Sequence, residues 1–346
     1  MTQMKAHRKY RLIMCALAAA CVLMVLLLLF KGSVDLTPAE VWSALLGSDD
    51  ASASMASMIV LQLRLPMACC ALLSGMALAV AGLLLQTTFN NPLAGPSIMG
   101  ISTGASLGVA IMLLALGGGA GVGLTHYAGA LLGALIGSAV MLALLLLFSR
   151  FVKGNAMLLI VGILLGYLAS SAISILNFYA TEEGVHSFVI WGLGSFLGVT
   201  HDDLMVYGPV ILLFVFGSFL MVKPLNALLL GSEYARSMGV NIRATRNRLL
   251  VLSGVLTAAV TAFCGPIGFL GLVIPHVARL TLNTSDHNRL LPATALWGAF
   301  SGLLCACISV LVGNRSALPI NAITPLLSVP IIIYVIVNRQ KLSYFR

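Results

Sequence analysis

The sequence predicts an all-helical polytopic membrane protein with about ten transmembrane helices, organised as a single domain over residues 1–346. Three observations predict this class. The mean hydropathy is +1.06, and hydrophobic residues make up 60% of the chain. Charged residues make up only 8%, and none lies between Arg64 and Arg150. A transmembrane helix needs roughly 20 mostly apolar residues, so long charge-free stretches of this kind are typical of a helical membrane protein.

Glycine, proline and polar residues divide the apolar stretches into successive spans. The first span is an apolar run that follows a basic N-terminal segment, a pattern that signal peptides also show. No A-x-A-like cleavage site directly follows Phe30, however, and nine further spans come after it, so we interpret it as a retained helix. The ten expected spans are 16–30, 58–85, 97–116, 124–148, 158–178, 204–222, 249–263, 267–280, 290–312 and 323–337.

The distribution of basic residues orients these spans, because cytoplasmic loops are enriched in Lys and Arg. With the N-terminus inside, ten spans return the C-terminus to the same side. Only three of the 19 basic residues then fall outside: Lys31, Arg64 and Arg315. One span more or fewer in mid-chain would destroy this separation. We therefore expect both termini to be cytoplasmic.

Composition argues against several other functions. The net charge of +9 lies in short loops beside apolar spans, so membrane topology explains it better than nucleic-acid binding does. The 7 cysteines show neither metal-ligand nor redox spacing, and we interpret them as small packing residues. His126 and His276 are the nearest candidates for a titrating group at depth, and packing or capping suits His276 better than metal ligation. Without such a group, coupling to protons or sodium is disfavoured.

The segment 223–248 is a polar, basic island between two apolar spans. Gly231 and Gly239 bracket a short stretch, 232–238, which begins with the good N-cap residue Ser232 and has an acidic residue in its first turn. The pattern predicts a small cytoplasmic helix that lies across the end of the bundle, where a soluble partner protein can bind it. The alternative is a plain amphipathic connector.

A faint internal repeat also runs through the chain. The tripeptide Leu-Ser-Gly occurs at 73–75 and 252–254, and a Gly-Pro break follows each copy, at 95–96 and 265–266. Under the expected topology the two copies have opposite orientations, which indicates an inverted repeat of the kind found in transporters. The alternative is that Gly and Pro are simply common in membrane helices.

Four segments, taken in order, carry a resemblance to a known family. They are LRLP at 63–66, NNPLAGPSIMGISTG at 90–104, LGSEYARSMGV at 230–240 and GPIGFLGLVIPHVARL at 265–280. With the ten-span layout, they resemble the FecCD-type permeases, the membrane subunits of ABC importers for vitamin B12, ferric siderophores and haem. The resemblance runs from about the first span to Ile336. It implies the architecture of a type II ABC importer permease in the bacterial inner (plasma) membrane. It also implies a homodimer or a pair of similar permeases, two ATPase subunits inside and a substrate-binding protein outside.

The resemblance also assigns candidate sites. The short helix after the sixth span corresponds to the coupling helix, which contacts the ATPase, and its residues here are Gly231, Ser232, Glu233, Ala235, Arg236 and Gly239. The cytoplasmic gate corresponds to Asn91, Leu93, Gly154 and Asn155. External arginines that dock the binding protein correspond to Arg64 and Arg315, although Met67 replaces the last Arg of the commoner R-L-P-R pattern, so one contact is weakened or replaced. Polar residues expected within reach of the pathway are Gln86, Ser102, Thr103 and Asn177.

We therefore predict a transport permease without catalytic activity of its own. No G-x-x-x-x-G-K-[ST] motif occurs, so ATP and Mg would be used by a separate ATPase subunit, and we expect this subunit to bind no cofactor and no metal. An iron chelate (ferric siderophore or haem) is the favoured substrate, with vitamin B12 next. The alternatives are a secondary carrier or channel working without ATP, which leaves the 223–248 island unexplained, and a membrane-embedded enzyme, which lacks a reactive cluster at depth.

Overall fold

The structure is a computed structural model, and it describes residues 2–32, 34–46, 55–115, 124–152, 154–313 and 317–337. The regular elements of this part are all helices, which confirms the predicted fold class. Seven of the described helices are long and apolar enough to cross a membrane, and three shorter apolar helices accompany them. Each of the ten expected spans coincides with one of these helices.

The apolar helices follow the predicted order. They are α1 (Thr2–Phe30), α4 (Leu65–Phe89), α5 (Ile101–Ala110), α6 (Leu124–Phe151), α7 (Asn155–Tyr179), α9 (His201–Phe219), α12 (Ile242–Cys264), α13 (Leu270–Leu282), α14 (His287–Val312) and α15 (Ile320–Val337). A π-helical segment precedes α4 (η1, Met58–Arg64) and another follows α5 (η2, Ile111–Ala115). Four short helices complete the described part: α2 (Pro38–Leu46), α8 (Glu182–Gly192), α10 (Val222–Leu228) and α11 (Ser232–Ser237).

One boundary changes the interpretation of the polar island. We expected the seventh span to begin at residue 249, but α12 begins at Ile242, where the side chain of Asn241 accepts a hydrogen bond from the backbone N–H of Ala244 at 3.0 Å. The basic residues of 242–248 therefore lie on the first turns of a long helix. Arg246 is buried there and donates to the backbone carbonyl of Ser149 at 2.7 Å, which ties α12 to the end of α6. The island is thus partly a helix-packing region.

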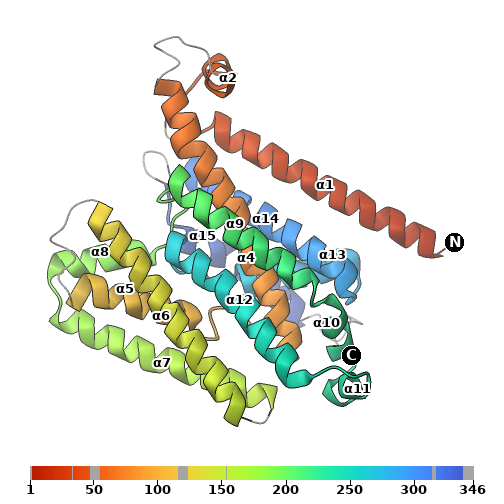
Figure 1. The fold of residues 1–346 in the computed structure, drawn as a ribbon. Coiled ribbons are helices and arrows are strands. Elements are labelled where there is room, and N and C mark those ends of the chain that lie inside the picture. Colours follow the sequence, from red (N-terminus) through yellow and green to blue (C-terminus); the bar gives the residue numbers. More distant parts are fainter. Residues whose placement is uncertain are drawn as a thin grey trace.

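Helix α4 runs through the middle of the bundle (Figure 1) and is buried along nearly its whole length. Its glycines allow the backbones of neighbouring helices to approach closely. A Cβ atom at Gly75 would lie 2.1 Å from the carbonyl oxygen of Gly298 in α14, and one at Gly82 would lie 1.7 Å from the carbonyl oxygen of Gly271 in α13. Because lipid tails are as apolar as the core, membrane helices associate largely through such close packing of small residues. The small residues of α4 therefore place it at the centre.

A second close helix pair lies to one side of α4. Helices α5 and α6 cross at Gly104 and Gly108 on α5 and Gly133 and Gly137 on α6, which form a small-x-x-x-small pattern on each helix. A Cβ at Gly108 would lie 1.9 Å from the carbonyl oxygen of Gly133. Helices α5 to α8 group together on this side, whereas α1 lies along the opposite edge (Figure 1).

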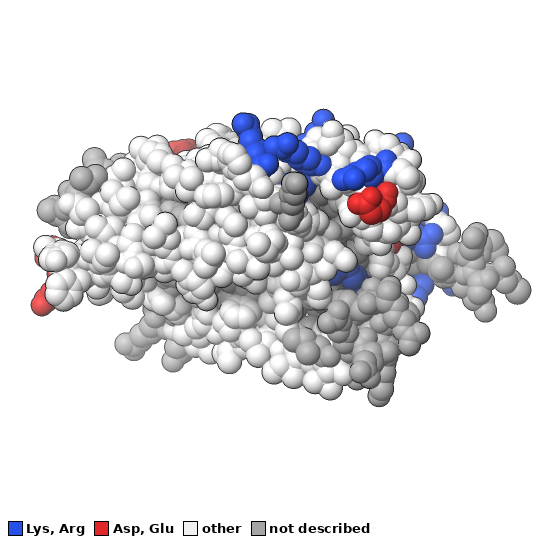
Figure 2. All heavy atoms as spheres, turned by 90° about the horizontal axis from the view of Figure 1, so that it is seen from below, with Lys and Arg blue, Asp and Glu red and all other residues white. Residues whose placement is uncertain are grey.

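The charged side chains gather at the ends of the molecule. In Figure 2, Lys and Arg lie mainly toward the right, with an acidic group among them, while acidic side chains appear at the left end. A broad uncharged area separates the two ends. This is the surface expected of a protein whose middle lies in hydrocarbon. Which end faces the cytoplasm stays a prediction from the basic residues of the loops.

Candidate functional site

The candidate coupling residues form one compact element. Helix α11 begins at Ser232, directly after Gly231, whose φ of +97° favours glycine, and the chain leaves the helix through Gly239 at φ +84°. The backbone N–H of Gly239 donates to the carbonyl of Arg236 at 2.9 Å, which closes the last turn. Ala235 is fully buried and holds the helix against the bundle. The sequence therefore predicted this short helix and both of its glycine boundaries.

The outer face of α11 carries both charge and apolar surface. Arg236 and Glu233 lie three residues apart, and their side chains form an exposed ion pair with an N–O distance of 3.8 Å. A pair of this kind contributes little stability, so its role is better sought in contact with another molecule. Tyr234 and Met238 are 55% and 59% exposed beside it. Large exposed apolar side chains surrounded by polar ones are typical of a protein interface.

The candidate gate residues come from two loops, one after α4 and one before α7. Asn91 and Leu93 lie in the turn after α4, where the Asn91 side chain accepts a hydrogen bond from the N–H of Leu93 at 2.9 Å. Helix α7 begins at Asn155, directly after Gly154, which has φ +106°. The amide of Asn155 donates to the carbonyl oxygen of Thr88, near the end of α4, at 2.6 Å. The structure thus holds the start of α7 against the last turn of α4, directly before the turn that carries Asn91 and Leu93, and their role as a gate stays a prediction.

A partly buried hydrogen-bond network connects the segment before α11 to the end of α4. In α14, the Nε2 atom of His287 lies 2.9 Å from the hydroxyl of Thr87, and its Nδ1 atom lies 2.8 Å from the side-chain oxygen of Asn226 in α10. The Asn226 amide nitrogen donates to Asp286 at 2.7 Å. We call Thr87, His287, Asn226 and Asp286 the relay cluster. It reaches α10 at one end and the residue beside Thr88 at the other.

The protonation state of His287 follows from these partners. Because the Asn226 nitrogen donates to Asp286, its oxygen must face His287, where it also accepts from the backbone N–H of that residue at 2.8 Å. The oxygen can only accept, so Nδ1 of His287 carries a proton and donates to it. Nε2 lies against the hydroxyl of Thr87, which also donates to the backbone carbonyl of Leu83 at 3.0 Å. Burial alone would raise the pKa of Asp286, but hydrogen bonds from Asn288 and Asn226 and the nearby charge of Arg289 outweigh it and lower the pKa. Asp286 is therefore ionised at neutral pH.

Other predicted positions have structural partners. Gln86 accepts a hydrogen bond from Arg279 at 2.6 Å and donates one to the carbonyl of Leu272 at 3.0 Å. Its side-chain amide therefore joins α4 to α13. Ser102 is buried and lies 3.3 Å from the hydroxyl of Thr261. His276 bonds through Nε2 to the carbonyl of Pro92 at 2.8 Å, in keeping with a packing role. Neither Gln86 nor Ser102 faces open space in this chain.

Arg64 lies in a different environment from the one expected of a docking residue. Its side chain is only 5% exposed. The guanidinium donates to the carbonyl of Leu29 at 2.7 Å and to the carbonyl of Val34, and it packs against Gly32. It thus holds the loop after α1 in place, and the docking role of Arg64 stays a prediction. Arg315 lies outside the described residues, as does the side chain of His126.

Sequence reasoning did not single out the relay cluster, although signals for it exist. Asn226 lies within the polar island, and the run 284–288 (T-S-D-H-N) separates two apolar spans. The sequence of each segment, however, is typical of an ordinary polar loop. Only the fold shows that His287 points back into the bundle toward α4, which is 200 residues away in the sequence.

Comparison with known proteins gives consistent results. The family model described as the FecCD transport family matches residues 19–338. The hemin transport system permease protein HmuU of Yersinia pestis is 35% identical over 293 residues, which is 82% of this chain and 84% of that protein. The vitamin B12 import system permease protein BtuC of Salmonella typhi is 34% identical over 321 residues, 91% of this chain and 94% of that protein.

A solved structure shares the fold. It is described as an inward-facing conformation of a metal-chelate type ABC transporter, and it superposes with a TM-score of 0.81 at 29% sequence identity. The match covers 95% of this chain and 99% of the other. Similarity therefore extends over nearly the whole chain, including the segments that hold the candidate coupling and gate residues.

Proposed function

Because this chain belongs to the FecCD transport family, we propose that it is the membrane-spanning permease of an ATP-driven importer for an iron chelate. The observation that carries this proposal is α11. It is a short helix with an exposed ion pair and two exposed apolar side chains, and it lies at the end of a bundle that otherwise faces lipid. An ATPase subunit is the partner that such an element fits. The permease itself binds no cofactor in this proposal, and ATP with Mg is used by that subunit.

The relay cluster offers a route from α11 to the gate. When the ATPase moves α11, the adjoining α10 moves with it. Asn226 of α10 then displaces His287, because two hydrogen bonds join these residues. His287 in turn bonds to Thr87, and the next residue along α4 holds Asn155 of the opposite gate loop. Buried hydrogen bonds are costly to leave unmade, so these groups move together or change partners together. The proposed transmission therefore needs no large rearrangement of the bundle.

Substrate delivery in this proposal comes from an extracytoplasmic binding protein. Arg315 is the simpler docking candidate, because Arg64 would first have to leave the carbonyls of Leu29 and Val34. Arginine suits this task because its planar fork pairs with two carboxylate oxygens at once. We place the permease in a bacterial inner membrane with both termini cytoplasmic, and we expect a pair of permeases with two ATPase subunits.

For the substrate, we favour a ferric siderophore or haem, with vitamin B12 next. The named relatives transport hemin and vitamin B12, and the solved structure is of metal-chelate type. All three candidates are bulky metal complexes. With only 8% charged residues in the chain, we expect the passage that they cross to carry little charge.

Reconstitution tests the proposal. The permease is placed in proteoliposomes with its ATPase and binding protein, and uptake of ferric siderophore, haem and cobalamin is followed with and without ATP. We expect uptake of one of these chelates that requires both ATP and the binding protein. Uptake that continues at the same rate without ATP would instead indicate a carrier or channel. Hydrolysis of ATP with no uptake of any metal chelate would contradict the substrate class.

A further inference from the structure

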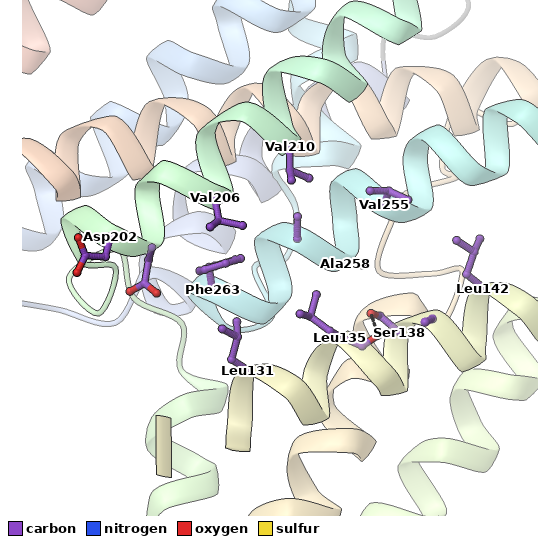
Figure 3. A pocket seen from close by; sticks show the side chains of 13 residues that line it. Leu131, Leu135, Ser138, Leu142, Asp202, Val206, Val210, Val255, Ala258 and Phe263 are labelled. Carbon is purple, nitrogen blue, oxygen red and sulfur yellow. Dashed lines mark hydrogen bonds between the residues drawn. The ribbon is translucent and has the colours of Figure 1, made fainter. Parts of the chain in front are cut away.

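Helices α6, α9 and α12 enclose an apolar groove of about 520 Å³ on the side of the bundle (Figure 3). Its lining runs from Leu131 to Leu142 on α6, from Asp202 to Val210 on α9, and from Phe263 back to Val255 on α12. Aliphatic and aromatic side chains make up nearly all of the wall. Leu135 and Val206 are 37% and 60% exposed, so the groove opens to the outer surface of the helices.

The length of the groove matches one leaflet of a bilayer. Leu142 lies eleven positions after Leu131, and at 1.5 Å per residue this corresponds to about 16 Å along α6. Val210 lies eight positions after Asp202, which corresponds to about 12 Å along α9. The hydrocarbon core of a bilayer is about 30 Å thick. The groove therefore extends from one end of the bundle to about the middle of the membrane.

Two carboxylates lie at the outer end of the groove, and they differ in their contacts. Asp203 belongs to a capping box: its Oδ2 accepts from the backbone N–H and the hydroxyl of Thr200, at 3.0 and 2.7 Å, and from the hydroxyl of Tyr127 at 3.1 Å. Asp202 is exposed and makes no hydrogen bond or ion pair with any residue that the structure describes. Its side chain lies at the end of the groove (Figure 3). An apolar channel that ends at an available carboxylate fits a molecule with an apolar chain and a cationic head.

We propose that this groove binds one acyl chain of a phospholipid whose headgroup carries a protonated amine, with the ammonium group paired to Asp202. An anionic headgroup is disfavoured there, because two carboxylates face it. The phosphate of an aminophospholipid is offset by its own ammonium group, which is the part that reaches Asp202. The proposal concerns a lipid site on the outer surface of the bundle. It is independent of the transported substrate.

Native mass spectrometry of the purified permease tests this proposal. Phosphatidylethanolamine and phosphatidylglycerol with identical acyl chains are added in turn, and the lipid bound per chain is measured. We expect one retained lipid with a preference of about fivefold for the ethanolamine headgroup, the size that an ion pair at an interface supplies. Asp202→Asn should abolish the headgroup preference and leave chain binding. Val206→Trp should fill the groove and remove the retained lipid with either headgroup.

Two matched variants separate the groove from general effects on the surface. Leu213→Trp adds the same bulk at a position on α9 that is 68% exposed and does not line the groove. Glu182→Gln removes an exposed acidic charge from α8 instead of α9. Both should bind lipid as the original chain does. Equal binding of the two headgroups, or lipid retention that survives Val206→Trp, would overturn the proposal. So would a finding that Val206→Trp separates two copies of the chain and leaves lipid binding unchanged, because the groove would then be an interface between copies.

Discussion

At the scale of single residues, Arg64 shows that a position in the sequence does not determine which groups a side chain contacts. Its place between two apolar segments predicts a charged group at the membrane surface. In the structure the charge is satisfied internally, by two backbone carbonyls of the segment that follows α1. Hydrogen bonds to a charged donor are stronger than neutral ones. Arg64 therefore joins α1 to the start of α4, whatever further role it has.

We predict that Arg64→Met destabilises the protein by about 2 kcal/mol, because the carbonyls of Leu29 and Val34 lose a charged donor and the bond to Leu29 is buried. The measurement is thermal unfolding of the purified permease in detergent. Arg236→Met is the matched control, since Arg236 is 69% exposed and its one ion pair is long, at 3.8 Å. That change should cost less than about 1 kcal/mol. If the two variants unfold at the same temperature, the internal role of Arg64 is wrong.

The relay cluster belongs to the same scale, and a neighbouring pair of threonines tests it. The hydroxyl of Thr87 bonds to His287 of α14, whereas the hydroxyl of Thr88 donates only within α4, to Leu84 at 2.7 Å. Thr87→Val leaves the buried Nε2 of His287 without its partner, which costs about 1–3 kcal/mol. We predict that this variant lowers the uptake obtained per ATP hydrolysed several-fold. Thr88→Val should leave this ratio unchanged.

Combining Thr87→Val with Asn226→Ala shows whether the two ends of the relay act together. Residues in one hydrogen-bond network are expected to give non-additive effects. The double variant should therefore be little worse than the more damaging single variant. Fully additive losses of coupling would mean that the two residues act separately and that the route through His287 is incorrect.

At the scale of elements, the close helix pairs depend on glycine. Gly108→Ala would put a Cβ 1.9 Å from a backbone carbonyl of α6, so the helices must separate. We predict a loss of about 1–3 kcal/mol from this overpacking, measured as a lower unfolding temperature in detergent. Gly129→Ala on α6 is the control, because nothing lies within 4 Å of its added carbon. Equal stability of the two variants would contradict the account of the α5–α6 crossing.

The elements themselves could be predicted well, and the reasons for the failures are physical. Apolar length indicated all ten spans, and the glycines at 231 and 239 marked α11, because those positions need a positive φ. The start of α12 was misplaced because basic residues in a first turn look like a loop. Arg246 nevertheless packs against α6 through its hydrogen bonds to Ser149. Helices α2 and α8 were not expected, since each is shorter than a span and lies in a loop segment.

The candidate site was predictable only in part. The candidate coupling and gate residues came from motifs. The structure places the coupling candidates on and beside one short helix and joins the start of α7 to the last turn of α4, and both roles stay predictions. The connection between them depends on contacts across 61 and 200 positions of the sequence, from Asn226 to His287 and from Thr87 to His287. No local pattern encodes such distances. The exposed apolar face of α11 was also missed, because burial is a property of the fold.

At the scale of the whole molecule, a bundle packed closely through its glycines carries a small exposed helix, α11, at one end. Helix α11 is held by the buried side chain of Ala235 and by backbone hydrogen bonds, while Tyr234, Met238 and the Glu233–Arg236 pair remain available. Such an arrangement lets a soluble subunit act on the membrane helices without inserting into them. The central claim is that α11 transmits the force of ATP hydrolysis to the gate.

The most direct test exchanges the charges of α11 while keeping the ion pair, with Glu233→Arg and Arg236→Glu in one variant. Because the pair can still form within the helix, the fold of α11 and the purification yield should not change. Uptake and ATP hydrolysis are then measured together in proteoliposomes that contain the permease, its ATPase and its binding protein. We predict that hydrolysis continues while uptake falls at least about tenfold, a change that corresponds to about 1.4 kcal/mol. Uptake at the original rate with the ATPase stably bound would contradict the claim that α11 is the transmission element.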